Sequence, residues 1–193
     1  LALGLKLFLL FRLLVKISTT FVRIDNGDDR YPVTVVENFY ENPDSVRTFA
    51  LNQKYKFRSQ MKDIPYVFPG CRSKDLSSIN KPLFESVSKK IISLFHNAEQ
   101  DYMQWAIATS FQSVSAEYGH GVIHTDQSVF AAVLYLTPDA PLDSGTSLFK
   151  PNAKFDEEKY QWSLKENDKR FDEGKLIMDT SYHDMFDEIV RVN

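Results

Sequence analysis

The chain has 193 residues, of which 43% are hydrophobic and 13% aromatic, a composition typical of a folded domain and not of a disordered segment. The formal net charge of −3 provides no bulk basic character, so charge does not indicate nucleic acid or an anionic membrane as a partner. Cys71 is the only cysteine and cannot form an internal disulfide, which favours a reducing, cytoplasmic location over a secreted scaffold.

The length predicts one domain, residues 15–193, preceded by a doubtful appendage, residues 1–14. Residues 1–17, LALGLKLFLLFRLLVKI, are rich in leucine but are interrupted by Lys6, Arg12 and Lys16. A membrane span needs about 20 mostly apolar residues, so no spanning helix is expected here, and no cleavage site marks a signal peptide. Three alternatives stay open: translated upstream sequence, a packed helix, or a helix that contacts a membrane surface.

The first half of the chain alternates short helices with loops. Residues 31–37 (YPVTVVE) are rich in β-formers, and Asn42 with Pro43 predicts the start of a short helix. Polar residues, prolines and a glycine in 53–78 indicate loops with short extended pieces. Asn80 then begins a second helix, along which four apolar residues recur at helical spacing: Leu83, Val87, Ile91 and Leu94.

The second half has the character of β-structure. Residues 103–117 alternate apolar and polar side chains, as a half-buried strand does. Residues 129–136 (VFAAVLYL) form a nearly continuous apolar run of strand length, and residues 146–149 predict a further short strand. The order, helices before strands, indicates an α+β fold.

The last part of the chain divides into a charged segment and an amphipathic one. Residues 150–174 are so rich in charge that a surface insertion is expected. Residues 182–193 place Met185, Ile189 and Val192 on one stripe at helical spacing, which predicts a C-terminal helix.

His124 and Asp126 form a His-x-Asp pair in front of the apolar run. In an extended strand, residues i and i+2 point to the same side, so one imidazole and one carboxylate would project together. They would supply two of the three ligands of the two-His-one-carboxylate site of non-haem iron enzymes. The motif is short, so the surrounding sequence determines how strongly it indicates a metal site.

That context resembles the iron(II)- and 2-oxoglutarate-dependent oxygenases, especially the prolyl-hydroxylase-like branch and its short phage and marine-bacterial members. In these proteins a His-x-Asp motif precedes a VLYLN strand and a Gly-Gly-Thr-x-Phe segment. The counterparts here are 124–126 (HTD), 133–137 (VLYLT) and 145–149 (GTSLF), with Ser144 in place of the first glycine. A Phe-Pro-Gly-x-Arg element, 68–72 (FPGCR), and the opening segment 33–51 (VTVVENFYENPDSVRTFAL) extend the resemblance.

The resemblance implies a double-stranded β-helix, or jelly roll, with flanking helices and with its last strands missing from this chain. It implies that His124 and Asp126 hold Fe(II) and that Tyr135 lines the site of the co-substrate 2-oxoglutarate, although Tyr135 could equally be core. The third ligand, a histidine, and the Arg or Lys that binds the distal carboxylate are expected beyond Asn193. The 193-residue chain alone is therefore expected to be inactive.

The resemblance implies hydroxylation of an unknown small-molecule or peptide substrate, and the net charge indicates no nucleic-acid partner. The alternative is a non-catalytic jelly-roll module that binds a ligand or partner. Among the other candidate residues, His183 is expected to pack in the last helix, and His120 to lie in a loop that could border the site. Arg72 could meet a substrate carboxylate, but a structural role is the simpler expectation.

Overall fold

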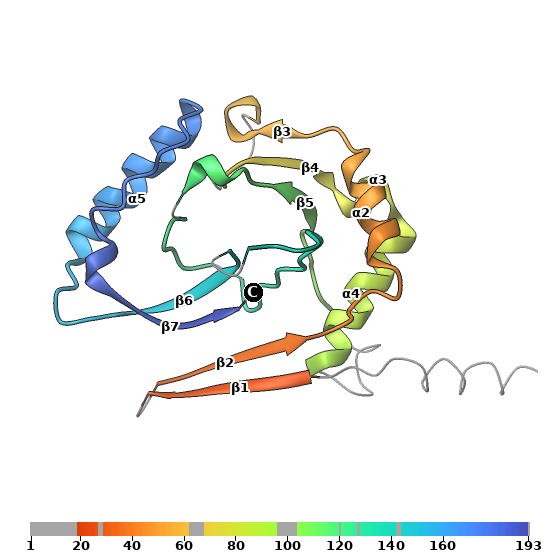
Figure 1. Cartoon of the computed structure of the whole chain (residues 1–193), viewed down its shortest axis with the longest axis horizontal. Coiled ribbons are helices and arrows are strands. Elements are labelled where there is room, and N and C mark those ends of the chain that lie inside the picture. Colours follow the sequence, from red (N-terminus) through yellow and green to blue (C-terminus); the bar gives the residue numbers. More distant parts are fainter. Residues whose placement is uncertain are drawn as a thin grey trace, which may run out of the picture. The chain divides into compact units, whose positions relative to one another are not determined.

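The structure is a computed structural model that describes residues 19–26, 29–61, 68–95, 104–119, 121–126, 128–141 and 144–192 (Figure 1). Helices and short β-sheets both occur in these ranges, so the predicted α+β class is confirmed. The chain divides into two compact units. The first contains Leu1–Thr48, Gln127–Lys150 and Asp187–Asn193, and the second contains Phe49–Asp126 and Pro151–Phe186.

In the ranges given above, no helix has both the length and the apolar character needed to cross a membrane. The predicted appendage, residues 1–14, lies outside these ranges, as do His96 and His120. A single domain over residues 15–193 stays a prediction.

The first unit begins with an antiparallel hairpin. Strand β1 (Thr19–Asn26) pairs with β2 (Asp29–Val36), with Thr19 opposite Val36 and Asn26 opposite Asp29. Strand β2 confirms the extended segment predicted at 31–37. Helix α2 (Pro43–Leu51) follows, and its start is also confirmed, because the Asn42 side chain accepts the Ser45 amide hydrogen at 2.9 Å.

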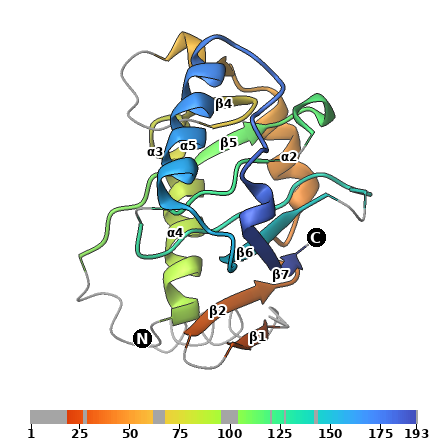
Figure 2. The ribbon, with the colours of Figure 1, turned by 90° about the vertical axis from the view of Figure 1, so that its left-hand side faces the viewer.

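The first unit also holds most of a second strand pair. Strand β6 (Thr146–Pro151), predicted at 146–149, pairs with β7 (Phe186–Val192) (Figure 2). The helix predicted at 182–193 is therefore wrong, because the chain forms a short 3-10 turn, His183–Met185, and then β7. The β-branched side chains of β7 lose rotamer freedom in a helix, and β6 supplies backbone partners for a strand.

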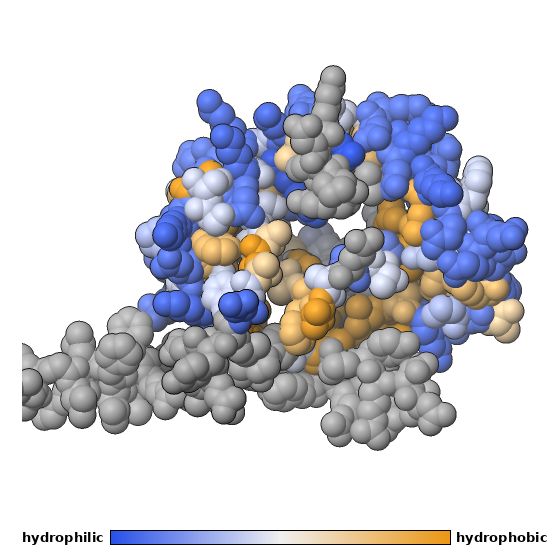
Figure 3. Space-filling view, turned by 180° about the vertical axis from the view of Figure 1, so that it is seen from behind, coloured by the Kyte–Doolittle hydropathy of each residue, from blue (hydrophilic) through white to orange (hydrophobic). Residues whose placement is uncertain are grey.

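Residues 128–141 contain no assigned strand, so the strand predicted at 129–136 is also wrong. An apolar run is held as a strand only when a neighbouring strand pairs with its backbone. Several of its large side chains are exposed, and Val129 is 90% exposed. Figure 3 shows apolar side chains, in orange, that reach the surface among the polar ones.

The second unit contains a three-stranded antiparallel sheet in the order β3-β4-β5. Its strands are β3 (Lys56–Phe57), β4 (Cys71–Asp75) and β5 (Ser110–Ser113), which are short pieces in predicted loops and in the predicted strand 103–117. Only β5 of that predicted strand forms in the described part of the segment, residues 104–117.

The short helix α3 and the capping residue Asn80 precede the longer helix α4. Helix α3 (Leu76–Ile79) is capped by Asp75, whose carboxylate accepts the Ser77 amide hydrogen at 2.8 Å. Helix α4 (Lys81–Phe95) confirms the predicted second helix, and the Asn80 side chain accepts the Leu83 amide hydrogen at 3.1 Å.

Helix α5 (Glu157–Asp172) occupies the segment that was predicted as a charged surface insertion, and this prediction is wrong. Asp156 caps the helix by accepting the Lys159 amide hydrogen at 3.0 Å. One face of α5 is buried and includes Tyr160 and Asn167. The segment is thus part of the core and carries its charges on the other face.

The core cluster of the second unit joins α5 to the turn before β7. Its buried members are Tyr160, Tyr182 and Met185. Four partly buried side chains pack against it: Ile123, Phe155, Leu164 and Phe186. Ile123 directly precedes His124, so the core of this unit reaches the predicted metal-binding motif.

Candidate functional site

The structure brings His124 and Asp126 together. The His124 Nε2 atom lies 3.6 Å from the Asp126 Oδ1 atom, and both side chains are more than half exposed. The predicted convergence of the two side chains is therefore present. The predicted strand is not, since residues 121–126 form no regular element.

The hydrogen bond of His124 Nδ1 determines the orientation of the ring and therefore of His124 Nε2. The His124 Nδ1 atom lies 2.9 Å from the Val122 carbonyl oxygen. A carbonyl can only accept, so this hydrogen bond places the proton of a neutral imidazole on Nδ1. The Nε2 lone pair is then free on the side that faces Asp126. Metal-binding histidines commonly use their other nitrogen in this way.

Ile123 is held by the hydroxyl of Tyr182. The Ile123 amide donates to the Tyr182 oxygen at 2.9 Å, and the hydroxyl donates to the Ile123 carbonyl at 3.3 Å. The Tyr182 side chain is 0% exposed. Burial raises the pKa of Tyr182 to about 12, so its hydroxyl is protonated and can donate at neutral pH.

Thr125 is held by a second tyrosine, Tyr160. The Thr125 side chain hydrogen-bonds the Tyr160 hydroxyl, and burial raises the pKa of Tyr160 despite that bond. The rings of Tyr160 and Tyr182 pack with their centroids 5.8 Å apart. Both chain neighbours of His124 are thus attached to the same aromatic pair.

The pair His124 and Asp126 fits two positions of a metal site. Two ligand atoms bound side by side at about 2.1 Å from a metal lie about 3 Å apart, so closing from 3.6 Å needs only a small movement. The set is incomplete, because the described part of the chain holds no group of three or more His, Cys, Asp or Glu side chains suited to a metal. His120 lies outside the described ranges.

One protein-family model matches most of the chain. The model of a family described as "Family of unknown function (DUF6445)" matches residues 18–187. The chain belongs to this family. No curated protein and no solved structure matches it. The DUF6445 match includes His124, Asp126 and both supporting tyrosines, but the family description assigns no activity to them.

Tyr135, predicted to bind 2-oxoglutarate, belongs to the first unit of this DUF6445 chain. Its hydroxyl donates to the Thr146 hydroxyl at 2.6 Å and lies 3.5 Å from the Val192 carbonyl oxygen. The side chain is 47% exposed. Tyr135 thus connects its loop to the β6–β7 pair, and its role toward 2-oxoglutarate stays a prediction.

Two other candidates have structural surroundings. The Arg72 guanidinium lies over the Phe68 ring at 4.2 Å, and Arg72 Nε donates to Gln112 at 2.8 Å. This arrangement agrees with the structural role expected for Arg72. The His183 ring packs edge-on against Tyr182, with centroids 4.8 Å apart. His183 is therefore packed as expected, although in a 3-10 turn.

The two tyrosines that support the site were not predicted from the sequence. Tyr160 lies in the segment predicted as an insertion, and Tyr182 lies at the start of the predicted helix. A usable signal was present for Tyr160, because Tyr160, Leu164 and Phe171 recur at helical spacing after a capping Asp156. Nothing local links Tyr182 to Ile123, 59 residues earlier.

Proposed function

We propose that this DUF6445 chain is an iron(II)- and 2-oxoglutarate-dependent oxygenase domain whose metal is held by His124 and Asp126. The observation that carries the proposal is the 3.6 Å approach of His124 Nε2 to Asp126 Oδ1. An imidazole and a carboxylate presented together match two of the three ligands of non-haem iron oxygenases. The sequence motifs around the pair supply the rest of the resemblance.

Bound iron(II) would supply oxygen activation, coupled to oxidative decarboxylation of 2-oxoglutarate and hydroxylation of a substrate. The chain's own residues orient the ligands: the Val122 carbonyl holds His124 Nδ1, and Tyr182 holds Ile123. His124 and Asp126 would supply two of the three protein ligands of such a site. The short sheets would then be parts of a double-stranded β-helix.

The test is succinate formation by the protein supplied with Fe(II), ascorbate and 2-oxoglutarate. We expect Asp126→Asn to lower the rate of succinate formation about 100-fold or more, because the variant removes a charged ligand. Asp139→Asn is the matched control, since Asp139 is exposed and has a backbone φ of 51°, a positive value that Asn also adopts.

Two results would contradict the proposal. One is succinate formation that continues at the same rate after iron is removed by a chelator. The other is an Asp126→Asn variant that forms succinate as fast as the Asp139→Asn control.

A non-catalytic binding module is the alternative function, and the exposed apolar side chains of the first unit favour it. Val129, Phe130 and Val133 are exposed, which is unusual for a run of this length unless a partner covers it. Absence of iron-dependent succinate formation from the full-length protein, together with loss of binding to a partner in Val133→Ser, would support this alternative.

A further inference from the structure

We propose that the Tyr182 hydroxyl is a positioning group for the His124 and Asp126 pair, acting through the backbone of Ile123. The inference rests on the proposed metal site. In this role the Tyr182 hydroxyl hydrogen-bonds the Ile123 backbone. It determines the direction in which the segment that carries both proposed ligands leaves the core.

The first support is the double contact at Ile123. One hydroxyl accepts from the Ile123 amide at 2.9 Å and donates to the Ile123 carbonyl at 3.3 Å. A tyrosine hydroxyl has one donor and can also accept, so both polar groups of this backbone residue are satisfied. The Ile123 side chain also packs against the core cluster. The residue before His124 is therefore fixed on its backbone and on its side chain.

The second support is the lack of other local order at the site. Residues 121–126 form no helix or strand, and His124 and Asp126 are more than half exposed. A segment without a backbone ladder takes its geometry from a few specific contacts. The contacts of Tyr182 with Ile123 and of Tyr160 with Thr125 lie on either side of His124.

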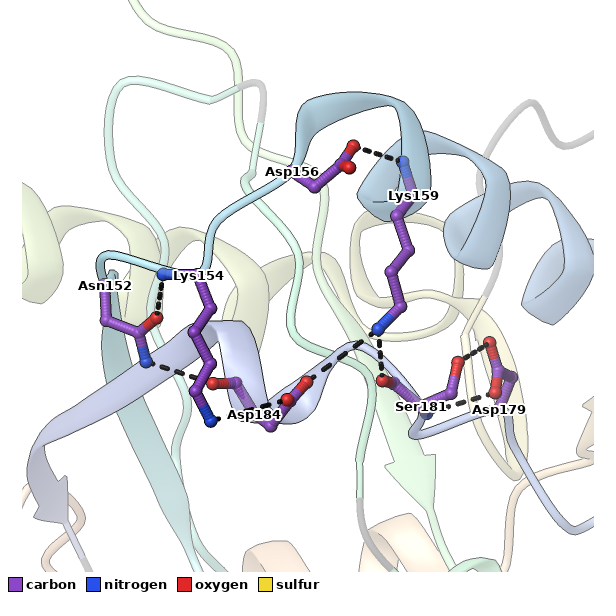
Figure 4. A network of polar contacts seen from close by, with 7 residues as sticks. All are labelled: Asn152, Lys154, Asp156, Lys159, Asp179, Ser181 and Asp184. Carbon is purple, nitrogen blue, oxygen red and sulfur yellow. Dashed lines mark hydrogen bonds and ion pairs between the residues drawn. The ribbon is translucent and has the colours of Figure 1, made fainter.

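The third support is the fixed position of Tyr182 itself. The side chain of Asn167 on α5 forms two hydrogen bonds with the backbone of Asp179. Its oxygen accepts the Asp179 amide hydrogen at 2.6 Å, and its nitrogen donates to the Asp179 carbonyl at 3.0 Å. Lys159 Nζ donates to the Ser181 carbonyl at 2.9 Å and lies 3.9 Å from Asp184 (Figure 4). Residues on both sides of Tyr182 are thus tied to α5, so the hydroxyl is held in place.

The direct test compares Tyr182→Phe with Tyr55→Phe in the full-length protein. The Tyr55 hydroxyl donates to the Ala50 carbonyl at 3.0 Å, so this control also loses one tyrosine hydrogen bond to the backbone. Mn(II) alone is the probe, and its dissociation constant is measured from the electron paramagnetic resonance signal of free Mn(II). We expect Tyr182→Phe to weaken binding about 10-fold or more and Tyr55→Phe to leave it unchanged.

Two readouts do not depend on metal. In the wild type, ¹⁵N resonances of His124 should report the Nδ1-protonated tautomer, and the Ile123 amide should exchange slowly with solvent. In Tyr182→Phe we expect a mixture of tautomers and faster exchange at Ile123. Thr125→Val, an exposed change that spares the core, should weaken Mn(II) binding in the same direction.

The outcomes separate this inference from the proposed function. If His124→Ala does not weaken Mn(II) binding, the proposed metal site is wrong. If His124→Ala weakens binding but Tyr182→Phe binds as the wild type does, the site stands and the positioning role is overturned. An unchanged His124 tautomer with unchanged Ile123 exchange in Tyr182→Phe overturns the role even where no Mn(II) binds.

Discussion

Gly70 lies at a position where a side chain would meet backbone. Its φ is +73°, and a Cβ atom built there would lie 2.0 Å from the Ser113 carbonyl oxygen. The glycine of the Phe-Pro-Gly-x-Arg element therefore lets β4 approach β5. We expect Gly70→Ala to lower the free energy of unfolding by roughly 3 kcal/mol, because the clash adds to the cost of positive φ.

Urea unfolding measures this loss, and Gly174→Ala is its control. Gly174 has a similar φ of +71°, but an added Cβ there would have no atom within 4 Å. Its substitution should cost about 1 kcal/mol from backbone conformation alone. Equal losses in the two variants would show that the close approach at Ser113 is unimportant.

Tyr182 should make stability depend on pH in the alkaline range. The pKa is 10.0 for an ordinary tyrosine and about 12 for Tyr182 in the folded chain, because of burial. Below the pKa of the unfolded state, the burial of the neutral Tyr182 hydroxyl contributes its full stabilisation to the folded state. As pH rises through that value the unfolded state loses its proton first, so stability falls. Between about pH 9 and about pH 11 the advantage of wild type over Tyr182→Phe should shrink by about 1 kcal/mol.

The measurement is urea unfolding of both proteins at several pH values. Other tyrosines titrate in the same range, but they are common to both proteins and cancel in the difference. A difference that stays constant or widens with rising pH would contradict the shifted pKa.

At the scale of elements, local sequence signals predicted the helix starts but not the elements that depend on tertiary contacts. Asn42 and Asn80 cap helices as expected, because a cap depends on residues three positions away. Strand β7 was predicted as a helix, since its apolar residues fit both periodicities and pairing with β6 decides between them. Helix α5 was missed because its buried face includes Ser163 and Asn167, which hydropathy does not mark as core.

Asn167 should be important for stability despite its polarity. It is 0% exposed and forms two hydrogen bonds with the backbone of Asp179. Asn167→Ala leaves both backbone groups without their partner and opens a small cavity. We expect a loss of roughly 2–3 kcal/mol in the free energy of unfolding, measured with urea.

Gln161→Ala is the control on the same helix. The exposed Gln161 side chain hydrogen-bonds Glu157 one turn earlier, and its removal should change stability by about 0.5 kcal/mol or less. A loss in Asn167→Ala no larger than this would mean that the Asp179 backbone finds other partners.

At the scale of the whole molecule, the site could be predicted only in part. His124 and Asp126 are two positions apart in sequence, so a short motif revealed them. Their supports, Tyr160 and Tyr182, come from α5 and from the turn before β7, and such contacts follow from the fold and not from any local pattern. The jelly roll itself stays a prediction, since the sheets of the described residues are short.

Residues 1–14 are predicted from the sequence to be an appendage. The core cluster of the second unit forms among residues between Ile123 and Phe186, so we expect deletion of residues 1–14 to shift the thermal midpoint by about 2 °C or less. The control is a double-mutant cycle that combines the deletion of residues 1–14 with Val129→Ser, since Val129 is exposed. If residues 1–14 cover that surface, Val129→Ser destabilises the full chain more than the deleted one. A loss of several degrees on deletion, about 1 kcal/mol, would show that the leucine-rich segment packs on the core.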